Sequence, residues 1–216
     1  MTHKGMRTFN YSSIKEQKWD SEILGLIAAI YRYAGKQELY LKQKPKELEK
    51  LVEIAKIQST KASNAIEGIV TTNTRIRQLV EEKTTPRNCD EQEIAGYRDV
   101  LNAIHESFDA IPLTKNYILQ LHKILYSHMN NPLAPFETLG AFDRICEEYN
   151  LVIGNFEVEP LIVIPIFIHD FLYIHPYNDG NGRMSRLLTT LLLYRSGFYV
   201  GKYISLEAKI AGNKDL

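Results

Sequence analysis

Apolar side chains recur every three or four residues over most of the chain, which is the spacing of amphipathic helices. This pattern predicts helices over residues 19–41, 45–66, 74–82, 90–108 and 114–125. The run from Arg186 to Arg195 is apolar nearly all round, as expected for a buried central helix. We therefore predict an all-α, mainly helical fold.

One segment departs from the helical pattern. Residues 144–158 contain two short runs with β-branched and aromatic residues, Tyr149–Ile153 and Phe156–Val158. Gly154 and Asn155 lie between these runs, and such a pair favours a tight turn between two strands. The sequence therefore predicts a small β-hairpin at residues 144–158.

Two connectors stand out between the predicted helices. Residues 130–140 contain two prolines and read as a loop, and residues 84–88 form a second connector with a proline. We place a module boundary at the second connector. This divides the chain into an N-terminal helical module, residues 1–88, and a core, residues 89–216.

Charge and composition exclude several classes of protein. The 216 residues include 26 Lys and Arg and 26 Asp and Glu, so no overall field draws the chain to nucleic acid or an anionic membrane. Residues 1–17 are too polar for a signal peptide, and no apolar run reaches the roughly 18 residues of a membrane span. Cys89 and Cys146 belong to no metal or disulfide motif. We expect a cytoplasmic protein that contacts no membrane and, by this chain alone, no nucleic acid.

The stretch His175–Arg186, HPYNDGNGRMSR, concentrates the polar chemistry of the chain between two apolar runs. Its segment Gly180-Asn181-Gly182 precedes the predicted central helix, where glycines allow a ligand to approach backbone N–H groups and the helix dipole favours anions. Arg183 and Arg186 are three residues apart and share a helix face. Two guanidinium groups beside such a nest predict a site for more than one phosphate group.

Two further side chains in this stretch suggest a reaction. A carboxylate beside polyphosphate is unfavourable unless a cation intervenes, so Asp179 suggests Mg²⁺. His175 has a side chain that titrates near neutral pH and suits a general base. Each piece alone also has an ordinary explanation, as a helix-end histidine, a turn or surface arginines. Their conjunction between buried flanks is what favours an active site.

The same stretch resembles the signature of the Fic (filamentation induced by cAMP) family, H-P-F-x-D/E-G-N-G-R-x-x-R. Only Tyr177 departs from it, since the family usually has Phe there. Because this position packs into the core, Tyr is a mild change if its hydroxyl finds a partner. The resemblance implies an all-helical Fic fold. It also implies a protein adenylyltransferase, which transfers AMP from ATP to a Ser, Thr or Tyr hydroxyl of a target protein and of itself.

The resemblance also implies a role for each matching residue. His175 would take the proton from the target hydroxyl, and Asp179 would hold Mg²⁺ across the α- and β-phosphates of ATP. The anion hole would be formed by Gly180, Asn181 and Gly182. Arg183 would contact the phosphates, and Arg186 would contact the γ-phosphate.

The predicted hairpin at residues 144–158 would be the flap of such an enzyme, where a target segment docks as an added strand. The match is weaker in this region. The family often shows G-x-F-R before the flap, whereas here Gly140-Ala141-Phe142 is followed by Asp143.

A second motif lies far upstream. Residues 63–68, SNAIEG, look like the family's inhibitory motif, S/T-x-x-x-E-G/N, in which Ser63, Glu67 and Gly68 are the matching residues. Ser63 and Glu67 are four residues apart on one helix face, so the hydroxyl could steady the carboxylate. The resemblance implies that Glu67 pairs with Arg186 and keeps it from the γ-phosphate. The ordinary alternative is an exposed glutamate near a helix end.

Several alternatives stay open beside a self-inhibited adenylyltransferase. The same site could remove AMP from a modified protein, or move a different group such as phosphate or phosphocholine. A nucleotide-binding regulatory module with little turnover is a third reading. Assembly with further copies of the chain also stays open, as does a DNA-binding module beyond residue 216, because related chains often continue there.

Overall fold

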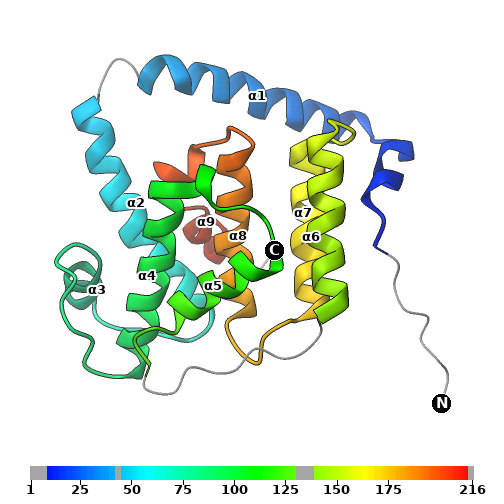
Figure 1. The fold of residues 1–216 in the computed structure, drawn as a ribbon. Helices are drawn as coiled ribbons and strands as arrows, with labels where there is room; N and C mark the ends of the chain where they lie inside the picture. Colours follow the sequence, from blue (N-terminus) through cyan, green and yellow to red (C-terminus); the bar gives the residue numbers. More distant parts are fainter. Residues whose placement is uncertain (1–8, 42–44, 130–138, 214–216) are drawn as a thin grey trace.

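The computed structural model describes residues 9–41, 45–129 and 139–213, and these residues form a bundle of helices (Figure 1). The helices are η1 (Tyr11–Glu16), α1 (Ser21–Leu41), α2 (Pro45–Ile66), α3 (Asn73–Val80), α4 (Cys89–Ser107), η2 (Phe108–Ala110), α5 (Lys115–Leu125), α6 (Leu139–Gly154), α7 (Pro160–Ile174), α8 (Asn181–Arg195), η3 (Val200–Lys202) and α9 (Leu206–Gly212). Most of the predicted loop at residues 130–140 lies outside the described residues. Within them there is no strand, as an all-α fold requires.

Side-chain caps explain where several helices begin. Thr114 caps α5 by accepting a hydrogen bond from the backbone N–H of Tyr117. For α4 the sequence suggests Asp90 as the cap, but Asn88 takes this role and accepts from the N–H of Glu91 at 2.9 Å. The helix therefore starts at Cys89, one residue before the predicted position.

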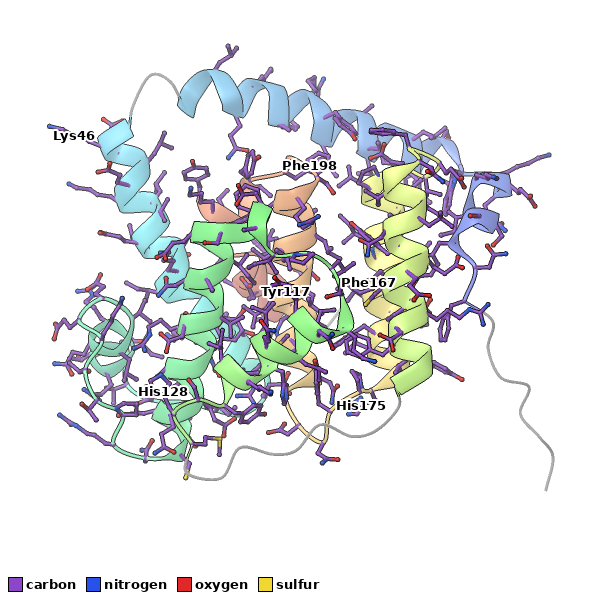
Figure 2. All side chains as sticks on the ribbon, viewed as in Figure 1. Lys46, Tyr117, His128, Phe167, His175 and Phe198 are labelled. Carbon is purple, nitrogen blue, oxygen red and sulfur yellow. The ribbon has the colours of Figure 1, made fainter. Side chains whose placement is uncertain are left out.

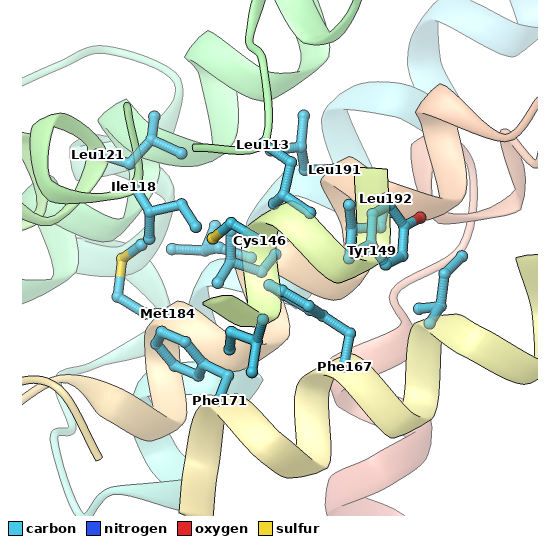
Figure 3. Close-up of a cluster of buried hydrophobic side chains, with 14 of the residues drawn as sticks. Leu113, Ile118, Leu121, Cys146, Tyr149, Phe167, Phe171, Met184, Leu191 and Leu192 are labelled. Atoms are coloured by element: carbon cyan, nitrogen blue, oxygen red, sulfur yellow. The ribbon is translucent and has the colours of Figure 1, made fainter. Parts of the chain in front are cut away.

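Helix α8 runs through the middle of the bundle and contacts α7 and α4. Its inward side chains are almost fully buried; they are Met184, Leu187, Leu188, Leu191 and Leu192. Figure 3 shows Met184, Leu191 and Leu192 among apolar side chains from α5, α6 and α7. The prediction of a buried central helix is thus confirmed, and this core holds the first turn of α8 in place.

The predicted hairpin at residues 144–158 is wrong, because residues 139–154 form the single helix α6. One face of this helix is buried at helical spacing, by Phe142, Ile145, Cys146, Tyr149 and Val152. Burial of that face against the core outweighs the β-propensity of the valine and isoleucine. Gly154 ends the helix, and the chain turns at Asn155 towards α7.

Helix α2 connects the first part of the chain to the bundle. It packs against α4 and α9, and α3 packs against both α2 and α4. Helix α1 crosses one end of the bundle (Figure 1). This arrangement brings the end of α2 to the first two turns of α8, where Glu67 meets Arg186. Over the described residues, we find no helix with the length and apolarity that crossing a bilayer requires.

Candidate active site

The loop between α7 and α8 begins with His175 in a left-handed conformation. Its φ is 52° and its ψ is 61°, and its backbone N–H caps α7 by donating to the carbonyl of Phe171 at 3.0 Å. Few residues other than glycine adopt this region, and such positions cluster at functional sites. The imidazole of His175 is exposed at the junction of the two helices (Figure 2).

Asn181 fixes the shape of this loop with its side chain. Its Nδ2 donates to the carbonyl of Tyr177 at 2.6 Å, and its Oδ1 accepts from the N–H of Tyr177 at 3.1 Å. The side chain is buried and fully engaged with the loop backbone. If Asn181 contributes to the predicted anion hole, it therefore does so through its backbone N–H and not through its side chain.

Tyr177 anchors the loop in the aromatic core. Its ring stacks on His122 with 3.7 Å between ring centroids, and the edges of Phe142 and Phe171 contact it. Within the described residues its buried hydroxyl has no hydrogen-bond partner. Among these residues the hydroxyl of Tyr177 thus lacks the partner that would make the change from Phe a mild one. Tyrosine in place of the usual Phe leaves an unsatisfied polar atom in the core.

His122, on α5, packs against the ring of Tyr177 and contacts the backbone of the loop. Its Nε2 lies 3.0 Å from the carbonyl oxygen of Asp179, and a carbonyl can only accept, so Nε2 carries the proton. Burial lowers the pKa of His122, which keeps the ring neutral at physiological pH. His122 lies on a different helix and in no motif, so no signal in the sequence singles it out.

Asp179 and Arg183 belong to one hydrogen-bonded cluster. The Tyr126 hydroxyl donates to Asp179 Oδ2 at 2.7 Å and accepts from Arg183 Nη2 at 2.7 Å. Arg183 Nη1 lies 2.5 Å from Glu93 Oε2, and its side chain is only 1% exposed. Tyr126 and Glu93 were not identified as site residues from the sequence. They hold Arg183 in one orientation beside Asp179.

The electrostatics of this cluster keep Asp179 ionised. Burial tends to raise its pKa, but the hydrogen bonds from Tyr126 and from the Gly180 N–H, together with the charge of Arg183, lower it on balance. The Asp179 side chain is still 54% exposed. An ionised carboxylate that reaches solvent is the kind of ligand that Mg²⁺ uses beside phosphate groups and water.

At both glycines near the start of α8, an added Cβ would be crowded by a neighbouring side chain. Gly180 has φ 83°, and a Cβ there would lie 2.9 Å from the Tyr126 hydroxyl oxygen. A Cβ on Gly182 would lie 2.3 Å from Glu67 Oε1. The carboxylate of Glu67 is therefore packed directly against the N-terminal turn of α8.

Glu67 reaches this position because α2 ends in a Schellman motif. The N–H of Ile69 donates to the carbonyl of Asn64 at 3.0 Å, and the N–H of Gly68 donates to that of Ala65 at 3.1 Å. Gly68 takes a left-handed φ of 82°, which a glycine adopts without strain. Gly68 therefore ends the helix and leaves Glu67 as the capping residue.

Arg186 is held by two residues of the predicted inhibitory motif. Its Nη2 donates to Glu67 Oε1 at 2.8 Å and to the Ser63 carbonyl at 2.9 Å. Its Nε donates to Ser63 Oγ at 2.8 Å. The hydroxyl of Ser63 thus binds the arginine, whereas the sequence suggested that it would steady Glu67. Arg186 is fixed between α2 and α8 by these three hydrogen bonds.

Comparison with known proteins gives a consistent result for this chain. Residues 112–193 match the family model described as Fic/DOC family. The chain is 25% identical over 173 residues to a protein adenylyltransferase Fic of Nematostella vectensis, a match that covers 70% of this chain and 40% of that protein. The chain therefore spans less than half of the length of this curated relative.

Solved structures with similar folds also carry Fic domains. A Fic domain containing signaling protein from Bacteroides thetaiotaomicron matches with a TM-score of 0.69 at 20% identity, over 85% of this chain and 79% of that chain. A Fic family protein from Desulfovibrio desulfuricans matches with a TM-score of 0.74 at 22% identity, over 92% of this chain and 65% of that chain. At such identities the likeness concerns the fold alone, and it agrees with the predicted all-α Fic fold.

Proposed function

This chain is a Fic family protein, and on that premise we propose that it is a protein adenylyltransferase held in check by its own Glu67. It would transfer AMP from ATP to a Ser, Thr or Tyr hydroxyl of a target protein and of itself. The observation that carries the proposal is the contact of Glu67 with Arg186 on the second turn of α8, close to the loop that bears His175. A carboxylate there takes the place that an anionic phosphate of the substrate would need.

In the proposed reaction, His175 accepts the proton of the target hydroxyl as its oxygen attacks the α-phosphorus of ATP. The bond from that phosphorus to the bridging oxygen breaks, and pyrophosphate leaves. The backbone N–H groups at the start of α8 would bind the phosphate oxygens once Glu67, which packs against Gly182, has moved away. Arg183 would balance phosphate charge, and Arg186 would orient the γ-phosphate.

Asp179 is the residue that fits a Mg²⁺ ion. Among the described residues no cluster of three or more acidic, histidine or cysteine side chains offers a site made by the protein alone. Mg²⁺ in nucleotide sites is commonly held by one or two carboxylates, with phosphates and water as the other ligands. The ionised, half-exposed Asp179 meets this requirement. When bound, the ion would neutralise charge on the phosphates.

We also propose that the site removes AMP from a modified protein by hydrolysis. Glu67 uses Oε1 to bind Arg186, and within the described residues no hydrogen bond is recorded to Oε2. The free oxygen could orient a water molecule that attacks the phosphorus of a protein–AMP ester and releases AMP and the hydroxyl. In that case Glu67→Gly would abolish AMP release from a pre-modified protein, and unchanged release would rule this activity out.

Transfer from α-labelled ATP to the protein itself and to a cell lysate tests the main proposal. Glu67→Gly should raise incorporation well above wild type, and adding His175→Ala should remove it. Glu81→Gly is the matched control, because Glu81 also caps a helix and also lies near an arginine, Arg77 at 3.7 Å. No gain with Glu67→Gly would refute the inhibitory role, and full transfer without His175 would refute its role as the base. Intact-mass analysis distinguishes AMP from phosphate or phosphocholine adducts.

A further inference from the structure

A single hydroxyl group lies between Arg183 and Asp179. The phenol oxygen of Tyr126, on α5, accepts a hydrogen bond from Arg183 Nη2 at 2.7 Å and donates one to Asp179 Oδ2 at 2.7 Å. The direct distance from Arg183 Nη2 to Asp179 Oδ2 is longer, at 3.3 Å. Hydrogen bonds between a guanidinium group and a carboxylate are usually about 2.7–2.9 Å long. The two charged groups therefore interact chiefly through the Tyr126 hydroxyl and only loosely by direct contact.

The chemistry of the three groups fixes the direction of these hydrogen bonds. A guanidinium group only donates and an ionised carboxylate only accepts, so the one hydroxyl proton of Tyr126 points to Asp179. Burial raises the pKa of Tyr126, which keeps this proton on the phenol. The residue is 1% exposed, and Arg183 Cζ lies 5.4 Å from the centroid of its ring. The buried ring thus holds the hydroxyl beside both partners.

Without this hydroxyl, the two charged groups would close on each other. Arg183 is 1% exposed, so water cannot replace the lost acceptor of its Nη2. Among the described residues, the other acceptor recorded for Nη2 is Asp179 Oδ2, and a shift of about 0.5 Å would give a direct salt bridge of ordinary length. Such a bridge opposes a metal ion, because it occupies Oδ2 and brings positive charge closer to the carboxylate. Oδ1 already accepts from the Gly180 N–H at 2.7 Å.

We propose that Tyr126 is a positioning residue, whose hydroxyl keeps Arg183 from closing on Asp179 and so leaves this carboxylate open to a Mg²⁺ ion. The Asp179 side chain is 54% exposed, so a metal ion with its water ligands can reach it. The consequence for Mg²⁺ rests on the proposed function, whereas the spacing of the two charged groups does not.

Crystal structures of the wild-type protein and of Tyr126→Phe test the spacing without any ligand. Phenylalanine keeps the buried ring and removes only the hydroxyl. We expect Arg183 Nη2 to lie about 2.8 Å from Asp179 Oδ2 in the variant, the length of a direct salt bridge. A distance that stays at 3.3 Å or grows would overturn the inference.

Calorimetric titration with ATP, once with excess Mg²⁺ and once with EDTA, tests the consequence for the metal. All variants are made in the Glu67→Gly background, because the Glu67 carboxylate packs against the start of α8 in the wild type. The dissociation constant without Mg²⁺, divided by that with Mg²⁺, measures what the metal contributes. Tyr126→Phe should lower this ratio by up to about tenfold, towards the ratio of Asp179→Asn, as groups that orient a metal ligand do.

Tyr194→Phe is the matched control, because it removes another buried tyrosine hydroxyl, one that contacts His105 at 3.3 Å. It should leave the ratio unchanged. If Tyr126→Phe weakens ATP binding equally with and without Mg²⁺, or leaves the ratio as it was, the inference is overturned. If the salt bridge closes in the crystal but Glu67→Gly shows no Mg²⁺-dependent binding of ATP even with Tyr126 present, the spacing holds and the proposed function fails.

Discussion

Replacing Gly182 with alanine should push Glu67 away from Arg186. A Cβ at this position would lie 2.3 Å from Glu67 Oε1, closer than real Cβ atoms approach, and 3.3 Å from Arg186 Nη1, which is a tight contact. The crowded atoms are the ends of flexible side chains, so the carboxylate can move and the fold is kept. Gly182 is helical, so alanine itself fits the backbone at this position.

The magnitude follows from two opposing effects. Alanine in place of glycine stabilises a helix by up to about 0.5–1 kcal/mol. Loss of the charge-assisted hydrogen bond costs about 1–2 kcal/mol, a value reduced for solvent because Glu67 is 37% exposed. Gly182→Ala should therefore destabilise the wild-type protein by roughly 0.5–1 kcal/mol. In a Glu67→Ala background the same change should stabilise it by up to about that amount.

Urea unfolding of the four proteins in this double-mutant cycle measures the free energies of unfolding. Gly35→Ala in both backgrounds is the control, because Gly35 is also helical and a Cβ there would meet no atom within 4 Å. It should stabilise both backgrounds equally. If Gly182→Ala has the same effect with and without Glu67, the reasoning from the close contact is refuted.

Three further changes have clear expected outcomes. Tyr177→Phe removes a buried hydroxyl that has no hydrogen-bond partner among the described residues. It should raise the free energy of unfolding by about 1 kcal/mol and with it the thermal midpoint; a lower midpoint would mean that the hydroxyl is hydrogen-bonded. Asn181→Ala removes two buried hydrogen bonds to Tyr177 and should lower the free energy of unfolding, measured in urea, by about 2–4 kcal/mol. A loss no larger than that of a surface substitution would mean that the Asn181 side chain does not hold the loop. Burial, with the charges of Lys56 and Lys202, lowers the pKa of His105 to about 3. Its unfolded pKa is about 6.5, so stability should fall as pH drops below that value, and His105→Leu should flatten this slope.

The fold was largely readable from the helical spacing of apolar residues, with α6 as the instructive exception. Its sequence contains valine, isoleucine and tyrosine near a Gly-Asn pair, which is a legitimate local signal for a hairpin. What decides the outcome is the buried face that begins at Phe142 and continues through Val152. The burial of that face depends on α7 and the core, which are distant in sequence, so residues 144–158 alone do not reveal it.

The candidate site was readable only where it is continuous in sequence. His175, Asp179 and Arg183 fall within one motif, whereas Tyr126 and Glu93 come from α5 and α4. These two are ordinary polar residues in amphipathic helices, and only packing brings them to Arg183 and Asp179. The division into modules at residue 88 stays a prediction.

The end of α2 has a further consequence. The N–H of Glu67 bonds the carbonyl of Asn64, which leaves the Ser63 carbonyl to the guanidinium of Arg186. The last turn of α2 has no basic residue of its own, so Arg186 serves as the cation at the negative end of its dipole. An anion that draws Arg186 away therefore also uncaps α2. Thermodynamic linkage makes this effect reciprocal. If a ligand that orders the last turn of α2 weakens the binding of the anion by some factor, the anion weakens the binding of that ligand by the same factor.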